Sequence, residues 1–332
     1  MKKNTGILSS TRGDGGLPAI GQSFVGYMAR TRAYLSDTYP IPAGLVRAAI
    51  IFLGQSTVLA NIHDTRVNLV SKYSLIGIWS VFSLLLILRL MDELKDREID
   101  RQLFSDRPLP SGRVRESDLV FSLVVLIVLF VLVNSQAGNA FWAALAVLGY
   151  ALLMFVYFFM PGLLRQHLLL NLATHNPVIP LMLLYLAILF SVESGMEIHH
   201  IDWAKTLLSI AMIWAPFFAW EIARKIRSAE EETAYVTYSQ IFGRAGAVLV
   251  AGLAQALALG LGIYFYRIDL MSAAFTTILI GAFSIVVVGY VRFLWHPSPR
   301  TSRLQPFAEF FALATLVAVI LDYVIAGSIL TN

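Results

Sequence analysis

The amino-acid sequence predicts an all-α, polytopic membrane protein with nine transmembrane helices, on three observations. The 332 residues are 58% hydrophobic and 14% charged, with a mean hydropathy of +0.71, whereas soluble domains carry about 25% charged residues. The apolar residues gather in nine stretches close to the roughly 20 residues that a helix needs to cross a bilayer. Lys and Arg residues lie almost entirely in alternate connections between these stretches.

The apolar stretches follow a polar N-terminal tail. Residues 1–40 form this tail, and apolar residues at helical spacing predict an amphipathic helix at the membrane interface over residues 22–36. Residues 41–328 form one transmembrane domain. Its predicted spans are 41–61, 70–91, 118–134, 139–160, 166–191, 203–223, 245–266, 269–291 and 306–328. The chain has no cysteine, which excludes disulfides and cysteine-based metal or redox sites.

The positive charges predict how the chain is oriented. With the N-terminal tail in the cytoplasm, the tail and the connections on its side hold nineteen Lys and Arg residues, against four on the opposite side. Cytoplasmic connections of membrane proteins carry such an excess. An odd number of spans then puts the C-terminus on the other side. We therefore expect a multi-pass protein of the cell inner membrane with a cytoplasmic N-terminus.

Three carboxylates follow the second predicted span. Asp92, Asp96 and Asp100 are four residues apart, so on a helix they share one face at intervals of about 6 Å along the axis. Like charges on one stripe repel each other, and more strongly near a membrane. Mg²⁺ would remove this repulsion, and it prefers one or two carboxylates with waters and substrate phosphates. The stripe predicts a magnesium site for a phosphorylated, lipid-soluble substrate; the alternative is a salt-bridged, solvated face that includes Glu93 and two arginines.

A rigid basic segment lies close behind these carboxylates. The stretch RPLPSG begins at Arg107, and its prolines and glycine restrict the backbone. It holds Arg107 near the carboxylates, and a guanidinium binds phosphate through two N–H donors. The stretch DELKDREIDRQLFSDRPLPSG, residues 92–112, resembles the first aspartate-rich motif of the UbiA superfamily of intramembrane prenyltransferases. In that motif, Asn-Asp-x-x-Asp-x-x-x-Asp is followed closely by Arg-Pro-Leu-x-x-Gly.

The resemblance covers the spacing of the motif and the number of predicted helices. Asp92 stands where the motif usually has Asn and Glu93 where it has its first Asp, while Asp96 and Asp100 match. The resemblance implies a UbiA-like fold, with nine helices around a central cavity that opens to the lipid. It also implies that an isoprenyl diphosphate binds through Mg²⁺ at two aspartate-rich sites, and that its prenyl chain is transferred to an acceptor in the cavity.

The second acidic motif of that superfamily, Asp-x-x-x-Asp, has no direct counterpart. The corresponding stretch after the sixth predicted span, residues 220–243, contains no Asp. We expect two glutamates to replace the aspartate pair as Mg²⁺ ligands, namely Glu221 and either Glu230 or Glu231. Two cations between them are expected to bind diphosphate oxygens, namely Arg224 and Lys225. The alternative is a plain helical Glu–Lys pair followed by a solvated acidic loop.

Polar residues in the fifth predicted span predict an acceptor cavity. Asn171 and His175 lie one turn apart in an otherwise apolar stretch, and polar groups at that depth face the protein interior. We expect both to orient the acceptor and His175 to take its proton. Tyr157 would line the same cavity, although a purely structural role is the alternative for any single aromatic residue. The alternative for the polar groups, favoured for Asn176, is that they satisfy carbonyls freed at a Pro177 kink.

Together these patterns predict Mg²⁺-dependent transfer of an isoprenyl group from an isoprenyl diphosphate to a small lipophilic or aromatic acceptor. The expected catalytic residues are Asp92, Asp96, Asp100 and His175. Membrane lipid is a further expected partner, and nucleic acid is not. Two alternatives stay open, a membrane terpene cyclase and a polytopic transporter. The transporter fits less well, because the charged groups gather at one membrane edge rather than at the midplane.

Overall fold

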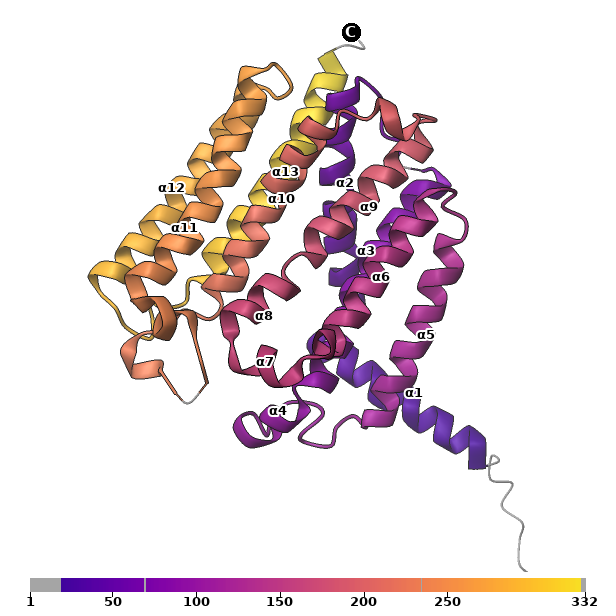
Figure 1. Ribbon diagram of the computed structural model, residues 1–332, viewed down its shortest axis with the longest axis vertical. Coiled ribbons are helices and arrows are strands. Elements are labelled where there is room, and N and C mark those ends of the chain that lie inside the picture. Colours follow the sequence, from indigo (N-terminus) through magenta and orange to yellow (C-terminus); the bar gives the residue numbers. More distant parts are fainter. Residues whose placement is uncertain (1–18, 69, 234, 330–332) are drawn as a thin grey trace, which may run out of the picture.

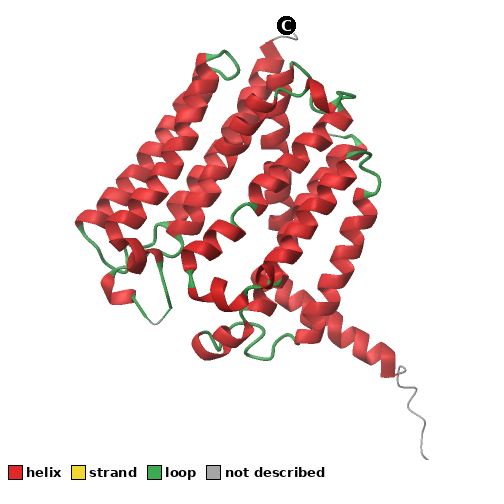
Figure 2. Cartoon of the chain, in the orientation of Figure 1, coloured by secondary structure: helices red, strands yellow, loops and turns green. Residues whose placement is uncertain are grey.

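The structure is a computed structural model that describes residues 19–68, 70–233 and 235–329 (Figures 1 and 2). These residues form helices and short connections, without any strand. Helix α1 (Ala19–Thr38) precedes the bundle. The long helices of the bundle are α2 (Ile41–His63), α3 (Lys72–Lys95), α5 (Glu116–Asn134), α6 (Ala140–Phe155), α9 (Val178–Glu193), α10 (Trp203–Ala223), α11 (Tyr238–Arg267), α12 (Ala273–Trp295) and α13 (Gln305–Ile329). The all-helical prediction is therefore confirmed for the described residues.

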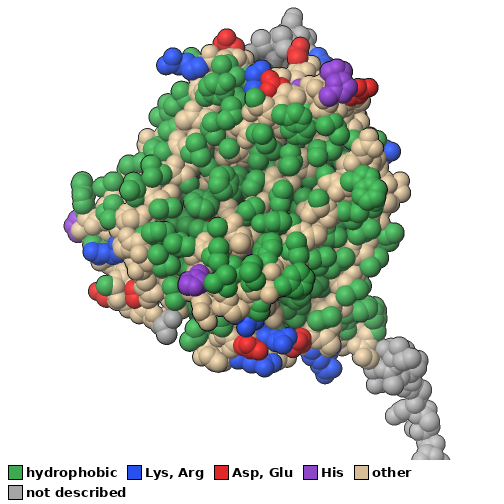
Figure 3. Space-filling model, viewed as in Figure 1, with side chains coloured by type: hydrophobic (Ala, Val, Ile, Leu, Met, Phe, Trp, Pro, Cys, Tyr) green, Lys and Arg blue, Asp and Glu red, His purple; other side chains and the backbone are tan. Residues whose placement is uncertain are grey.

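Eight segments of the described chain are helical, long and apolar enough to cross a membrane. They match eight of the nine predicted spans in chain order. The remaining predicted span, residues 139–160, is the fourth in chain order. This prediction was too long by several residues, because α6 ends at Phe155 after 16 residues. Figure 3 shows hydrophobic side chains over the middle of the molecule and charged side chains near its two ends. This distribution is the one that a bilayer imposes on its proteins.

The helix α6 ends early because the chain turns left-handed. Tyr157, Phe158 and Phe159 have φ angles of 51°, 49° and 61°. An L-residue in this conformation costs roughly 1–2 kcal/mol, so three in a row must be held by their surroundings. The turn redirects the chain into the short helix α7 (Pro161–Gln166). An apolar sequence alone does not reveal such a turn, which explains the overlong prediction.

The fifth predicted span consists of two helices. Helix α8 (Leu168–His175) ends before Pro177, which lacks the N–H needed to continue it, and α9 follows. The indole N–H of Trp214 in α10 donates to the side-chain oxygen of Asn176 and ties the break to α10. The side-chain oxygen of Asn176 thus accepts from an indole, and the predicted bond from Asn176 to a carbonyl freed at the kink stays a prediction. No residue of α8 is fully buried, although Leu168 and Leu172 pack against the core formed by α10 to α13.

The ends of α3 and α10 lie at the end of the bundle that also carries α1, α4 (Arg97–Leu103) and α7, opposite the C-terminus (Figure 1). Helix α3 packs against α2, α5 and α9, whereas α10 packs against α11 and α13. Helix α1 is bound to α5, because Arg30 Nε and Asp118 Oδ2 are 2.6 Å apart. The helix predicted over 22–36 is therefore present, and its position at a membrane interface stays a prediction; residues 1–18 lie outside the described part.

The close approach of α2 and α3 depends on a glycine. A Cβ added to Gly77 would lie 2.4 Å from a ring atom of Phe52, which is itself buried. We expect Gly77→Ala to destabilise the protein by about 1–3 kcal/mol, because the ring must move within a packed core. Gly149→Ala is the matched control, since its Cβ would meet no atom within 4 Å and alanine favours a helix. Thermal unfolding in one detergent compares them, and equal stability would contradict the packing argument.

Candidate active site

The three predicted carboxylates lie at the junction of α3 and α4. Helical hydrogen bonds continue across this junction, with Asp96 N 2.9 Å from Asp92 O and Asp100 N 2.9 Å from Asp96 O. The carboxylates therefore keep the one-turn spacing that the sequence predicted. Their surroundings differ, because Asp92 is exposed, Asp96 is half-buried and Asp100 is buried. The charged groups within electrostatic reach of Asp92 are Asp96, Lys95 and Arg89 from its own segment, and Arg224 from the end of α10.

Asp100 holds the arginine of the RPLPSG segment. Arg107 Nη1 lies 2.6 Å from Asp100 Oδ1, and the guanidinium carbon of Arg107 lies 4.2 Å from the centroid of the Phe104 ring. The predicted proximity of Arg107 to the carboxylates is therefore seen in the structure. The carboxylate of Asp100, however, is already engaged by this arginine.

Glu93 does not join the stripe. Its carboxylate is buried and pairs with Arg89 one turn earlier, at 2.6 Å between Nη2 and Oε2. Arg97 instead pairs with Glu116 at the start of α5. The salt-bridged helix face that was the alternative interpretation of this segment is therefore not formed by Glu93 and Arg97.

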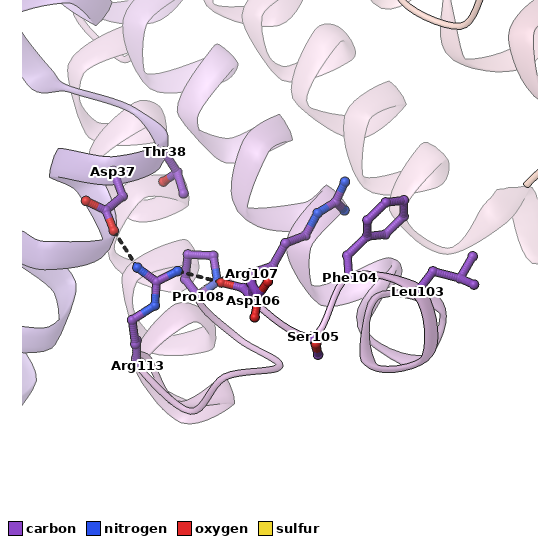
Figure 4. A pocket seen from close by; sticks show the side chains of 9 residues that line it. All are labelled: Asp37, Thr38, Leu103, Phe104, Ser105, Asp106, Arg107, Pro108 and Arg113. Atoms are coloured by element: carbon purple, nitrogen blue, oxygen red, sulfur yellow. Dashed lines mark hydrogen bonds and ion pairs between the residues drawn. The ribbon is translucent and has the colours of Figure 1, made fainter. Parts of the chain in front are cut away.

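A pocket of about 460 Å³ opens beside Arg107 (Figure 4). It is lined by residues of α1 and of the segment after α4: Asp37, Thr38, Leu103, Phe104, Ser105, Asp106, Arg107, Pro108 and Arg113. Arg113 Nη1 lies 2.8 Å from Asp37 Oδ2, and its Nη2 donates to Asp106 O at 2.7 Å. Arg107 extends away from this arginine in Figure 4. The two arginines of the segment thus serve different partners, and Arg107 is the one directed to the carboxylates.

The end of α10 carries the acidic residue and the cations predicted there. Arg224 binds Glu221 through two bonds, Nε to Oε2 at 2.6 Å and Nη2 to Oε1 at 2.9 Å, and Lys225 Nζ lies 3.5 Å from Glu221 Oε1. The plain Glu–Lys pair of the alternative interpretation therefore does form. Burial lowers the pKa of Arg224, but the carboxylates of Glu221 and Asp92 more than offset this, so that its pKa is raised. Arg224 thus lies within electrostatic reach of Asp92 on α3.

Asp96 meets charges from several segments. Burial raises its pKa, and the neighbouring carboxylate of Asp100 raises it further. Three cations oppose this rise, namely Lys95, Lys225 and Arg107. Because the pKa stays raised, these cations offset the cost of the Asp96 charge only in part. A further cation at this position would therefore stabilise the ionised carboxylate.

The loop glutamates lie apart from these carboxylates. Glu231 Oε2 accepts bonds from Ser228 N at 3.0 Å, Ser228 Oγ at 2.8 Å and Ser302 Oγ at 2.5 Å. Burial raises the pKa of Glu231, but these bonds outweigh it and the pKa is lowered, so this carboxylate is satisfied without a metal. Glu230 is exposed and makes no hydrogen bond or ion pair with the residues that the structure describes. The structure therefore does not bring either residue to Asp92 and Asp96.

The predicted acceptor residues gather around a lysine that the sequence analysis missed. Lys95 Nζ lies 2.6 Å from His175 Nε2, 3.2 Å from Met154 O and 3.9 Å from the centroid of the Tyr157 ring. His175 Nδ1 lies 2.9 Å from Asn171 O. Lys95 follows Asp92 by three residues, and this spacing would have placed it on the carboxylate face of the helix.

The left-handed turn after α6 sets the position of Tyr157. Two cations lie close to its ring. The guanidinium carbon of Arg165, on α7, is 5.0 Å from the ring centroid, and Lys95 Nζ is closer. Asn171 Oδ1 is buried and has no hydrogen-bond partner among the described residues. The structure thus brings His175 and Tyr157 together at the end of α3, with Asn171 one turn before His175, and the acceptor cavity stays a prediction.

The carboxylates available at this site fit one magnesium ion with few protein ligands better than a site in which all ligands come from the protein. Asp92 and Asp96 make no direct ion pair with any described residue, whereas Asp100 and Glu221 do. Two carboxylates with open positions suit Mg²⁺, which keeps waters and substrate phosphates as its other ligands. In the described chain, the only group of three or more His or acidic side chains with donor atoms within 4.8 Å of one another is Glu197, His199 and His200, exposed at the opposite end.

Comparisons with known proteins agree with this architecture. Two solved structures superimpose with low sequence identity, so they inform on the fold alone. One is titled as work on digeranylgeranylglyceryl phosphate synthase in membranes; it has a TM-score of 0.61 and 14% identity, covering 89% of this chain and 99% of that one. The other is the apo structure of a UbiA homologue from Aeropyrum pernix K1, with a TM-score of 0.62 and 15% identity, covering 84% and 98%. No curated protein sequence matches the chain.

The family model described as the UbiA prenyltransferase family matches residues 40–316. This range contains both charged helix ends and all but the last of the spanning helices in full. The match agrees with the resemblance of residues 92–112 to the first motif of that superfamily and with the helical fold. The chain is therefore an integral membrane protein that belongs to the UbiA prenyltransferase family.

Proposed function

We propose that this protein transfers an isoprenyl group from an isoprenyl diphosphate to a lipophilic, aromatic acceptor, and that the reaction depends on Mg²⁺. Membership of the family supports prenyl transfer within the membrane. The observation that carries the finer proposal is the placement of Asp92 and Asp96 opposite the cations of α10. Asp92 lies within reach of Arg224, and Asp96 within reach of Lys225. Carboxylates and cations that converge in this way suit a diphosphate bound with a divalent cation.

Asp92 and Asp96 would hold the metal ion, since their carboxylates are the ones without a direct ion pair at this site. Bound there, Mg²⁺ would offset the negative charge that builds on the departing diphosphate. Asp100 takes a positioning role in this proposal, because it fixes Arg107 at 2.6 Å. Glu221 similarly orients Arg224 and Lys225. We retain Glu230 and Glu231 as predicted ligands only if the loop that carries them moves toward α3.

The cations bind and orient the diphosphate. Arg107, Arg224 and Lys225 are each held by a carboxylate, so their side chains are already ordered before substrate arrives. A guanidinium can donate two parallel N–H bonds to phosphate oxygens. In the reaction, the bond between the prenyl carbon and the diphosphate oxygen breaks, and its electron pair leaves with the diphosphate. Fixed cations stabilise this developing charge most when the site excludes water.

The acceptor would lie against α8. A carbon of the acceptor forms the new bond to the prenyl carbon, and the proton that it loses passes to His175 Nε2. Asn171 offers a buried amide oxygen without a partner in the described structure, which suits a hydroxyl donor on the acceptor. The face of the Tyr157 ring attracts positive charge, as its contacts with Lys95 and Arg165 indicate, so it would stabilise the allylic cation where those groups leave the face free.

Replacement of a metal ligand tests this assignment. We expect Asp96→Asn to lower diphosphate release from an allylic prenyl diphosphate by at least about 100-fold, because charge stabilisation at the leaving group is lost. Glu98→Gln is the control, since Glu98 is exposed on α4 and lies two residues away. Release is measured with and without Mg²⁺ on proteins of equal thermal stability. Undiminished turnover of Asp96→Asn would overturn the assignment, and a cyclised product formed without acceptor would identify a terpene cyclase instead.

The proposed orientation can be tested because the chain has no cysteine. We propose that the end carrying α4 faces the cytoplasm, as the excess of Lys and Arg there indicates. Single cysteines at two exposed positions, Glu98→Cys and Glu197→Cys, mark the two ends of the bundle. In intact spheroplasts, a membrane-impermeant maleimide should label Glu197→Cys, and it should label Glu98→Cys only after lysis. The reverse pattern would contradict the orientation.

A further inference from the structure

The ammonium group of Lys95 is held by groups on other helices. It lies 2.6 Å from His175 Nε2 on α8 and 3.2 Å from Met154 O on α6. The ring of Tyr157 covers it at 3.9 Å from the centroid. Tyr157 begins the left-handed turn at residues 157–159, so the backbone conformation of this turn sets the direction of the ring that contacts Lys95.

This position of Lys95 determines what His175 can do. His175 Nδ1 lies 2.9 Å from Asn171 O, and a carbonyl oxygen only accepts, so Nδ1 carries the hydrogen of the neutral ring. The lone pair is then on Nε2, where it accepts a hydrogen bond from Lys95 Nζ. While that bond lasts, His175 cannot take a proton from an acceptor at Nε2. The proposed base is therefore blocked in the structure as it stands.

Lys95 also lies beside the proposed position of the diphosphate. It follows Asp92 by three residues on the same face of α3, and its charge lies within electrostatic reach of both Asp92 and Asp96. Its side chain is a flexible stem of four carbons, so the ammonium group can turn from α8 toward this face. A phosphate oxygen carries negative charge and forms a stronger, charge-assisted bond with an ammonium than a neutral imidazole does. A bound diphosphate therefore competes with His175 for Lys95.

We propose that Lys95 moves from His175 to the diphosphate when the prenyl donor binds, and thereby frees His175 Nε2 to accept the proton of the acceptor. This inference rests on the proposed function and adds an order to it. The donor diphosphate binds first, and only then does the site contain an active base. The proton released when the acceptor carbon bonds to the prenyl carbon goes to Nε2, and the diphosphate leaves with the electron pair of the broken C–O bond.

The first experiment measures diphosphate binding by calorimetry, with inorganic diphosphate and Mg²⁺ and without any prenyl chain. We expect Lys95→Met to weaken binding by about 10- to 100-fold, the range for one charged hydrogen bond. Lys72→Met is a matched control, because Lys72 starts the same helix at its other end and lies 4.8 Å from the ring centroid of Tyr73. Its affinity for diphosphate should equal that of the unchanged protein.

The second experiment reads the state of His175 directly. Diethyl pyrocarbonate modifies imidazole nitrogens that carry an available lone pair, and peptide mass spectrometry resolves His175 from the other five histidines. We expect slow modification of His175 in the empty protein and faster modification once Mg²⁺ and inorganic diphosphate are present. In Lys95→Met, modification should be fast under both conditions. A loss of fold would instead raise the reactivity of His63 as well, because His63 and His175 are the two partly buried histidines and the other four are exposed. This pattern separates the two effects.

The outcomes distinguish this inference from the proposed function. If the unchanged protein does not bind diphosphate with Mg²⁺, both are overturned. If it binds, but Lys95→Met binds equally well, the proposed function stands and the movement of Lys95 is overturned. The movement is likewise overturned if diphosphate slows the modification of His175 or leaves it unchanged in a protein that binds diphosphate.

Discussion

The site depends on charges that meet across two helices far apart in sequence. Asp92 and Asp96 at the end of α3 lie within electrostatic reach of Arg224 and Lys225 at the end of α10, and both helices pack against α2 and α9. Carboxylates near the low-dielectric part of a membrane protein are unfavourable unless cations lie close. The segments that follow these helices also meet, since Phe104 and Tyr235 have ring centroids 6.3 Å apart. The connections that follow the two helices are thereby in contact.

Ion pairing divides the acidic residues into two groups. Asp100 and Glu221 each bind an arginine through a bond of 2.6 Å, so they order cations rather than offer ligand positions. Asp92 and Asp96 have no such direct pair among the described residues, and Asp96 keeps a raised pKa. The evenly spaced carboxylates of α3 and α4 therefore differ in their partners. In the proposed function, Asp92 and Asp96 would hold a divalent cation, whereas Asp100, like Glu221 on α10, would hold an arginine that binds the phosphates.

The sequence predicted the helices and the carboxylate face well, because apolar run length and helical period are local properties. It failed where the outcome depended on partners distant in the chain. The extent of α6 was too long because an apolar run does not reveal the left-handed turn at Tyr157. Glu231 was a candidate ligand, yet Ser302 from another connection satisfies it. Lys95 was overlooked although it had the helical spacing, since a lysine beside a carboxylate is ordinarily a solvated ion pair.

The charge balance of the site supports the proposal that a divalent cation binds together with the diphosphate. Five cationic side chains meet at the site, namely Lys95, Arg107, Arg165, Arg224 and Lys225. Four carboxylates lie among them, namely Asp92, Asp96, Asp100 and Glu221. The empty site is thus close to neutral, with one net positive charge, which avoids strong self-repulsion. A prenyl diphosphate brings about three negative charges, roughly one more than a phosphate monoester. In the proposed function, one Mg²⁺ would offset the negative charge that then remains, so a single ion arriving with the diphosphate would not need a second acidic pair on α10.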